Sequence, residues 1–151
     1  MNEWIITIKK EYADAILESK KKIEVRTRIP ASLSCGDLVF VHVGGTGDRV
    51  DFAFFVESII SYSPMGLYSR HRKCLCIDLS DYLKYTEGRR TVFAIGIGTV
   101  IKYGTMLTIK SLGVLHAPQW FTRVPKLNKK NMQNCTTGYV RNNPPLGTAD
   151  A

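Results

Sequence analysis

The chain has 151 residues, 44% of them hydrophobic, which is enough for one compact domain with its own core. Lysine and arginine (21) outnumber aspartate and glutamate (13), and the formal net charge of +8 favours polyanionic partners. No apolar run reaches the roughly 18–20 residues of a membrane helix, and the first residues lack the order of a secretory signal, so we expect a soluble, cytoplasmic protein without membrane partners.

The first part of the chain predicts a strand, a helix and a second strand. Residues 4–10 are rich in β-forming side chains and predict the first strand. A helix is predicted after this strand, and the lysines at 20–22 suit the negative, C-terminal end of its dipole. Residues 22–29 alternate apolar and charged side chains and stop at Pro30. The helix is predicted from one apolar stripe formed by Tyr12, Ala13, Ile16 and Leu17.

A hairpin is predicted next. Gly36 and Asp37 form a turn before an apolar strand at 38–43, and the glycine-rich residues 44–49 lead into another strand at 50–60. The glycines suggest a phosphate-binding loop, but that motif needs a following helix and a Lys-Ser/Thr pair. Neither is present, so a loop between two strands is the favoured interpretation.

Two helical segments follow the hairpin. Residues 63–76 predict a helical turn plus a basic loop. Residues 77–88 predict a short helix in which Leu79, Tyr82 and Leu83 share one side.

The remaining segments predict two strands and a tail. The strands are expected at 91–103 and 106–115, and we expect Trp120 and Phe121 to pin the following chain onto the domain. The last residues contain few large apolar side chains, so we place the domain at 1–127 and an irregular or flexible tail at 128–151. The element order favours an α+β fold, a small, curled, mostly antiparallel β-barrel with two or three short helices.

The cysteines show no spacing typical of disulfides, so reduced thiols are expected. A zinc site at His71, Cys74 and Cys76 is an alternative, but the two cysteines are closer together than structural zinc ligands usually are. We therefore predict no metal and no cofactor. The four cysteines are Cys35, Cys74, Cys76 and Cys135.

One polar face of the strand at 22–29 is the main candidate site. Successive side chains of a strand point to opposite faces, so Lys22, Glu24, Arg26 and Arg28 share one face, with Lys21 at its mouth. This face is either a solvated edge with weak ion pairs or the lining of a ligand cleft. As a lining, the cations would suit a phosphate and Glu24 an exocyclic amine. A lysine beside other cations also has a lowered pKa, which suits a base or a nucleophile.

Residues 11–43 resemble the start of the ASCH domain, a relative of the PUA fold. That family shows a helix ending in G-x-K-x-x-E-x-R, followed by a loop, a Gly-Asp pair and an apolar strand. Residues 81–97 look like the later helix, turn and strand, and the resemblance covers roughly residues 4–110. The matching positions here are Ser19, Lys21, Glu24 and Arg26, then Gly36 and Asp37.

The resemblance implies a cleft that binds RNA or a nucleotide or nucleoside. Within this interpretation, Lys21, Glu24, Arg26, Arg28 and Tyr85 are the ligand-binding candidates. A separate nucleic-acid patch that tracks phosphates is expected, with a solvated loop surface as the alternative. The patch consists of Arg70, Arg72, Lys73, Arg89 and Arg90.

An enzyme of the same fold is the alternative function. Some small family members resemble amidohydrolases that use a lysine, a threonine and a glutamate on N4-acylated cytidine. Here Glu24 occupies the threonine position, and Asp78 is the acid nearest to the expected glutamate. An amidohydrolase or ribonuclease would use Lys21 as base and Glu24 as acid or water-positioning group. A third possibility is an interaction module whose polar face is only solvated.

Overall fold

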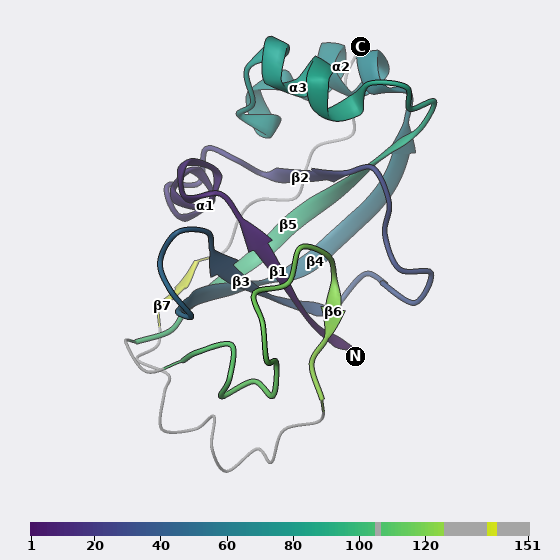
Figure 1. Ribbon diagram of the computed structural model, residues 1–151. Helices are drawn as coiled ribbons and strands as arrows, with labels where there is room; N and C mark the ends of the chain where they lie inside the picture. The colour runs from purple at the N-terminus through teal and green to yellow at the C-terminus, as the bar shows by residue number, and fades with distance from the viewer. Residues whose placement is uncertain (105–106, 126–138, 142–151) are drawn as a thin grey trace.

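The computed structural model describes residues 1–104, 107–125 and 139–141. It contains three helices and one strongly curved, seven-stranded sheet with the order β2-β5-β4-β3-β1-β6 and β7 beside β5 (Figure 1). The strands are β1 (Glu3–Ile8), β2 (Ile23–Arg26), β3 (Leu38–Val43), β4 (Val50–Tyr62), β5 (Val92–Lys102), β6 (Thr122–Arg123) and β7 (Tyr139–Arg141). The helices are α1 (Lys10–Leu17), α2 (Pro64–Leu75) and α3 (Leu79–Thr86).

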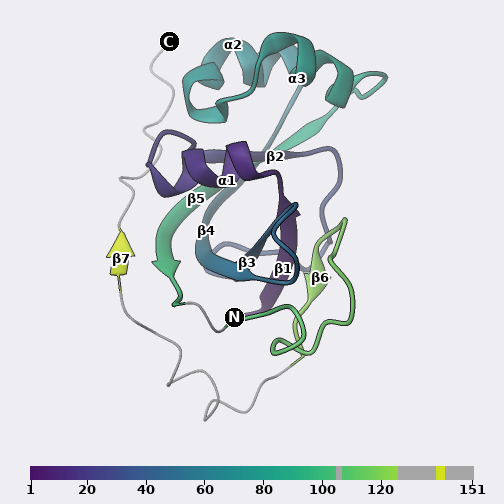
Figure 2. The ribbon, with the colours of Figure 1, turned by 60° about the vertical axis from the view of Figure 1, so that its left-hand side comes forward.

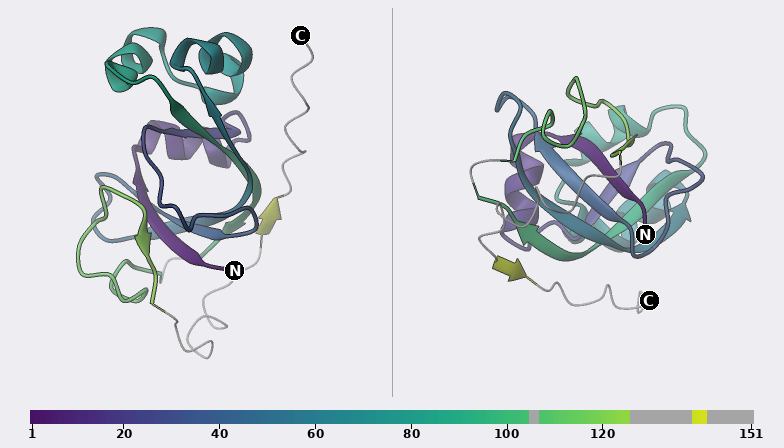
Figure 3. Two further views of the ribbon diagram at one scale, coloured as in Figure 1. Left: turned by 90° about the vertical axis from the view of Figure 1, so that its right-hand side faces the viewer. Right: turned by 90° about the horizontal axis from the view of Figure 1, so that it is seen from below.

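The sheet is mixed. β1 and β3 are parallel, because α1 and β2 lie between them in the chain and form the long connection that parallel pairing needs. The other named strand pairs are antiparallel. The sheet curls round so that β1, β3, β4 and β5 surround the interior, as the views in Figure 2 and Figure 3 show. The predicted small α+β barrel-like fold is confirmed.

Both faces of the sheet are covered. The concave interior is filled by side chains of β1, β3, β4 and β5, and Ala13 and Ile16 of α1 close it. Residues 107–124 cover part of the outer face and pack on Ile5 and Phe40. Because neither face of β3 meets solvent, every residue of this strand is buried, and β3 is apolar except for His42, whose ring nitrogens contact Thr7 Oγ1 and Gly47 O.

The two later helices form a separate layer above β2 (Figure 2). Ile23 and Val25 of β2 face this layer and pack with Leu67 and Leu75 of α2 and Tyr82 of α3. The opposite face of β2, with its charged residues, is therefore directed toward α1 and the end of β1. Over the described residues, no helix combines the length and the hydropathy of a membrane-spanning segment.

The strand predicted at 106–115 is absent from its described part, residues 107–115, which forms turns with one isolated bridge to Arg49. Hydroxyl groups compete with the ladder here: Thr108 N–H donates to Ser111 Oγ, and Ser111 N–H donates to Thr108 Oγ1. Gly113 then adopts a φ of +77°, which ends any extended path. The apolar residues of this segment still reach the core, but as a covering loop.

The helical layer also differs from the prediction. α2 spans 12 residues with a kink at His71, where the backbone is not helical, although only a turn was expected. Its first part is favoured because Ser63 caps the first turn by accepting from Gly66 N–H and Pro64 occupies the first position. In α3, the three residues predicted to share one side differ in burial: Tyr82 is buried, whereas Leu79 and Leu83 are exposed. α3 turns Tyr82 and Thr86 toward the layer below, which leaves the two leucines on the outer side.

The predicted boundary at 127/128 and nearly all of the predicted tail lie outside the described residues. Residues 139–141 are the described part of that segment, and they pair with β5 through Lys102, Ile101 and Val100. Phe121 is buried against Trp4, as the pinning role requires, whereas Trp120 is exposed.

Candidate ligand pocket

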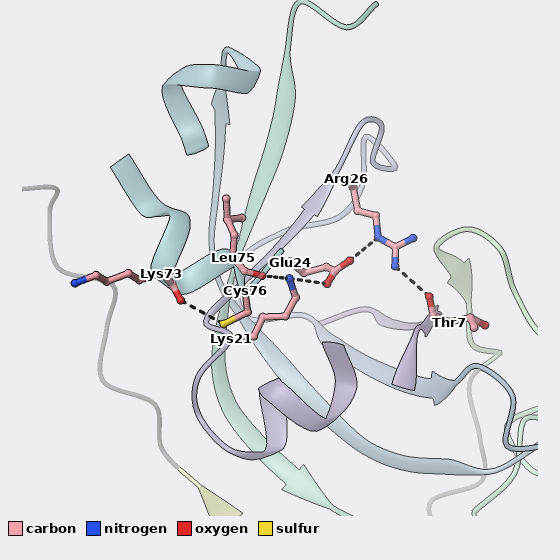
Figure 4. Close-up of polar contacts among 7 residues, drawn as sticks. All are labelled: Thr7, Lys21, Glu24, Arg26, Lys73, Leu75 and Cys76. Atoms are coloured by element: carbon pink, nitrogen blue, oxygen red, sulfur yellow. Dashed lines mark hydrogen bonds and ion pairs between the residues drawn. The ribbon is translucent and has the colours of Figure 1, made fainter. Parts of the chain in front are cut away.

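A pocket of about 480 Å³ lies between the end of β1, helix α1, strand β2 and helix α3. This volume falls within the roughly 300–1,000 Å³ of typical small-molecule sites. Figure 4 shows polar contacts of Lys21, Glu24 and Arg26 with neighbouring residues, some of which lie outside the pocket lining. The lining residues are Thr7, Ile8, Lys9, Tyr12, Lys21, Glu24, Val25, Arg26, Ile77, Asp81, Lys84 and Tyr85.

The end of α1 places Lys21 in this pocket. Ser19 adopts a left-handed conformation with a φ of +61°, Lys20 N–H donates to Ala15 O at 2.9 Å, and Ser19 N–H donates to Ile16 O at 3.0 Å. These two bonds define a Schellman motif, which reverses the chain after a helix. Lys21 N–H also donates to Ala15 O at 3.0 Å, so the first residue after the reversal is held against the helix end.

The Lys21 side chain is almost completely enclosed, with 1% of its surface exposed. Its Nζ donates to Leu75 O at 2.7 Å, lies 3.8 Å from Glu24 Oε2, and sits 5.2 Å from the centre of the Tyr12 ring. Leu75 is the last residue of α2, so its carbonyl has no partner within the helix and lies at the negative end of the helix dipole. Lys21 therefore also caps α2.

Burial lowers the pKa of the Lys21 ammonium below its ordinary value of 10.5. Glu24 and the Cys76 thiol oppose this shift by favouring the charged form, and the Arg26 guanidinium adds to the lowering. Desolvation outweighs these charges. Lys21 is thus closer to a neutral amine than an exposed lysine would be.

Glu24 and Arg26 form a rigid pair beside Lys21. Arg26 Nε donates to Glu24 Oε1 at 3.0 Å, and Arg26 Nη2 donates to Thr7 O at 3.2 Å, which ties β2 to the end of β1 (Figure 4). Glu24 Oε2 has no hydrogen bond to any described residue, because its 3.8 Å separation from Lys21 Nζ exceeds bonding distance. The pocket floor therefore holds a carboxylate oxygen that is ion-paired with an amine but accepts no hydrogen bond from a described residue.

Solvent exposure of the lining residues increases from the floor of the pocket to its rim. Lys21 is 1% exposed and Tyr85 is 45% exposed, and the exposed Lys9, Asp81 and Lys84 also line the opening. Asp81, Lys84 and Tyr85 share one face of α3 because residues three and four apart are neighbours on a helix. Tyr12, whose pKa is raised first by burial and then by nearby carboxylates, forms part of the wall.

Four of the five predicted ligand-binding residues meet in this pocket: Lys21, Glu24, Arg26 and Tyr85. Arg28 does not line it. β2 ends at Arg26, the chain bends, and the Arg28 guanidinium lies 4.8 Å from the centre of the Trp120 ring. The sequence analysis missed Thr7, Lys9, Asp81 and Lys84 as lining residues.

The predicted nucleic-acid patch lies apart from the pocket lining. Its first three members are exposed on α2, and its last two are exposed in the turn after α3. At the proposed zinc alternative, His71 Nε2 contacts the Tyr62 hydroxyl at 3.3 Å. No three His, Cys, Asp or Glu side chains within the described segments are grouped closely enough to hold a metal ion.

The family and structural comparisons agree with this architecture. The ASCH domain family model matches residues 6–136. The crystal structure of ASCH from Zymomonas mobilis superposes with a TM-score of 0.80 at 21% identity, covering 90% of this chain and 96% of that one. Two substituted variants of that protein give TM-scores of 0.79 and 0.77 at 21% and 20% identity, covering 89% and 91% of this chain and 97% and 100% of theirs.

A search of curated proteins found no match. Because the family model spans most of the sequence, the chain belongs to the ASCH domain family. At about 20% identity, the structural similarity to the Zymomonas mobilis protein establishes the fold.

Proposed function

We propose that this protein binds a nucleotide of RNA, or a free nucleotide or nucleoside, with the base inserted into the pocket at Lys21, Glu24 and Arg26. The observation that carries the proposal is Glu24 Oε2, which is ion-paired with Lys21 Nζ at 3.8 Å but accepts no hydrogen bond from a described residue, on an almost fully buried pocket floor. An acceptor and a donor side by side complement the edge of a nucleobase, where donors and acceptors also alternate.

The increase in solvent exposure from the pocket floor to the rim favours one orientation of the ligand, with the base inside and the phosphate at the rim. A base fits the enclosed floor, since its ring is apolar on both faces and its edge can bond Glu24 and Lys21. A phosphate stays at the rim, where Lys9 and Lys84 are exposed. Tyr85 at the same rim is placed to contact the sugar or the base.

Calorimetric titration with CMP, AMP, GMP and UMP tests this proposal. We expect at least one of them to bind the wild type. Glu24→Gln should weaken binding by about 10- to 150-fold, because a hydrogen bond to a charged group contributes roughly 1.5–3 kcal/mol. Glu18→Gln is the matched control, since Glu18 is exposed and pairs with Lys20 outside the pocket, and it should change Kd by less than about 2-fold.

Glu24 also holds Arg26, so the fold of Glu24→Gln needs a check by circular dichroism. Tyr85→Ala at the exposed rim provides a second variant that leaves the buried pair intact. Millimolar nucleotides that fail to bind the wild type, or that bind all three variants equally, contradict the proposal.

Catalysis is the second candidate, and the lowered pKa of Lys21 favours it. A neutral Lys21 amine would take a proton from a water that attacks the acyl carbon of N4-acetylcytidine and return it to the departing N4. In RNA cleavage it would take the 2′-hydroxyl proton while the 2′-oxygen attacks the adjacent phosphorus, and return that proton to the 5′-oxygen as the P–O5′ bond breaks. Glu24 beside it would position the water or act as the acid.

The test is incubation of wild type and Lys21→Met with N4-acetylcytidine and with short RNA, followed by chromatography. Product from wild type alone, with a rate that rises as Lys21 deprotonates, supports the enzyme. Binding without product from either substrate supports the binding protein.

A further inference from the structure

Trp120 and Phe121, the two residues that precede β6, differ in solvent exposure. Phe121 is 5% exposed and packs edge-on against Trp4, with 6.4 Å between the ring centres. Trp120 is 45% exposed. Trp120 lies in a bend just before β6, so burial of Phe121 leaves the neighbouring tryptophan ring at the surface.

An arginine lies against this exposed ring. The Arg28 guanidinium is 4.8 Å from the centre of the Trp120 ring, within the range of a cation–π contact. The pair holds a tryptophan in a defined orientation while nearly half of its surface stays open to solvent. Arginine-supported aromatic rings of this kind are typical stacking platforms for unpaired bases.

The platform adjoins the pocket. Arg26, whose Nε bonds Glu24 on the pocket floor, also lies 5.9 Å from the centre of the Phe121 ring. Arg26 and Arg28 are two residues apart on one segment, and Phe121 and Trp120 are adjacent on the other. These contacts, and the pairing of β6 with β1, place Trp120 on the side of the pocket formed by Arg26 and the end of β1.

Positive charge accompanies both positions. Arg28 is exposed beside Trp120, and Arg123 is exposed on β6, 5.4 Å from the centre of the Trp4 ring. Phosphates that link one nucleotide to the next need such cations along their path. A duplex would not fit this arrangement, because its bases are paired and stacked and neither the pocket nor Trp120 could reach their faces.

We propose that Trp120, held by Arg28, stacks on the base adjacent to the nucleotide in the pocket, so that the ligand is a single-stranded nucleic acid of at least two nucleotides. This inference rests on the proposed function and specifies its ligand class. Lys21 and Glu24 read one base edge, and Trp120 takes the neighbouring base by its face.

Ligand length is the variable that tests it. Fluorescence anisotropy or calorimetry compares a nucleoside monophosphate with a single-stranded RNA tetranucleotide that contains the same base. In Trp120→Ala the monophosphate should bind within about 2-fold of wild type. The tetranucleotide should bind roughly 5- to 150-fold more weakly, since stacking on an aromatic side chain contributes about 1–3 kcal/mol per base. Trp120→Phe should recover part of the loss, and Leu115→Ala, another exposed apolar truncation, should cause none.

Tryptophan emission gives an independent readout, because the chain contains 2 tryptophans and Trp4 is buried. In Trp4→Phe, Trp120 is the single emitter, and the tetranucleotide should quench it while the monophosphate does not. Tetranucleotide binding that depends on Glu24 but is unchanged in Trp120→Ala overturns this inference and leaves the proposed function standing. Absence of both monophosphate and tetranucleotide binding overturns the two together, and equal quenching by a base-free polyanion such as heparin overturns the stacking role.

Discussion

Lys21 illustrates how one residue serves both fold and pocket. Its ammonium caps the last carbonyl of α2 at Leu75, and the same group forms the pocket floor beside Glu24. A buried ammonium is costly to desolvate, and a capping role alone could be filled by backbone or water. The ion pair with Glu24 and the bond to the Leu75 carbonyl offset part of this cost.

The lowered pKa of Lys21 predicts how stability depends on pH. Between the folded pKa and the ordinary value of 10.5, the unfolded state binds more protons at this site than the folded state does. The contribution of Lys21 to the free energy of unfolding should therefore increase as pH rises through this window, because the buried lysine loses its charge. Urea unfolding of wild type and Lys21→Met across alkaline pH measures this component as the difference in slope.

The expected result is a flatter pH dependence in Lys21→Met than in wild type. Lys110→Met, an exposed lysine in the outer loop, serves as the control and should follow the wild-type slope. Parallel curves for wild type and Lys21→Met contradict the lowered pKa.

Asp37, the acidic member of the Gly-Asp pair, has a structural role. Its carboxylate accepts from Asn2 N–H at 2.9 Å, Trp4 Nε1–H at 3.0 Å and Ser34 N–H at 2.9 Å. Burial alone would raise the pKa of this carboxyl, but the three donors outweigh it and hold the pKa below its ordinary value of 3.8. This part of the family motif therefore joins the start of β1 to the turn before β3.

Asp37→Asn should lower the free energy of unfolding at pH 7 by about 1.5–3 kcal/mol, the usual contribution of hydrogen bonds to a charged group. Because the folded pKa is depressed, this contribution is present above the unfolded pKa and is lost as pH falls through the folded pKa. Denaturant unfolding at pH 7 and near pH 3 should show the gap between wild type and variant narrowing in acid. A constant gap contradicts this account.

At the scale of elements, the end of α1 sets the geometry of the pocket. Sequence alternation alone assigns Glu24 and Arg26 to one face of β2 but does not place Lys21, which lies before the strand. The Schellman turn at Ser19 brings Lys21 to that face, and the K-x-x-E-x-R spacing reflects a helix end joined to a strand. The motif was recognisable in the sequence, whereas the reason for its spacing required the turn.

Ser19→Gly should stabilise the protein. Ser19 has a φ of +61°, a conformation that glycine adopts without the steric cost that other residues bear. We expect the free energy of unfolding to rise by about 0.5–1 kcal/mol. This net value already includes the opposing effect of the greater chain entropy of glycine in the unfolded state. Chemical denaturation measures the change. Ser69→Gly, within α2, is a control and should destabilise, since glycine in a helix interior is unfavourable; equal effects at both positions contradict the explanation.

Other elements show where local pattern fails. β-propensity predicted a strand at 106–115, but hydroxyl–backbone bonds and Gly113 turn residues 107–115 into a loop that covers the outer face. Tyr12 belongs to the apolar stripe predicted for α1 and packs against the core, yet its ring also lines the pocket, 5.2 Å from Lys21 Nζ. Periodicity indicates which side of an element faces the protein interior, but not whether that side packs in the core or lines a pocket.

At the scale of the whole molecule, the net charge of +8 acts on any nucleic-acid ligand over a longer range than the pocket does. The predicted patch on α2 and after α3 lies outside the pocket lining, so its contribution to affinity is separable from that of Glu24. Binding of a single strand that contacts Z phosphates weakens with salt by a slope of about −0.7Z in log–log form.

Salt titration of a longer single-stranded RNA, about 12 nucleotides, tests whether the predicted patch touches phosphates. The variant to compare with wild type carries Arg70→Ala, Arg72→Ala and Lys73→Ala. If these three residues each contact a phosphate, the slope should become shallower by roughly 2, because each lost contact removes about 0.7. A matched control removes three other exposed lysines, Lys20, Lys102 and Lys110, and thus the same formal charge.

The control distinguishes direct phosphate contacts of the patch from attraction of RNA by the net charge of the protein. An equal change of slope in both variants means that RNA responds to net charge, and the patch is then a solvated surface. A change confined to the α2 variant, with monophosphate affinity unaltered, assigns this helix to the path of the strand beyond the pocket. If the pocket holds a base and the patch contacts the backbone, only a ligand long enough to reach both will show the two effects in one titration.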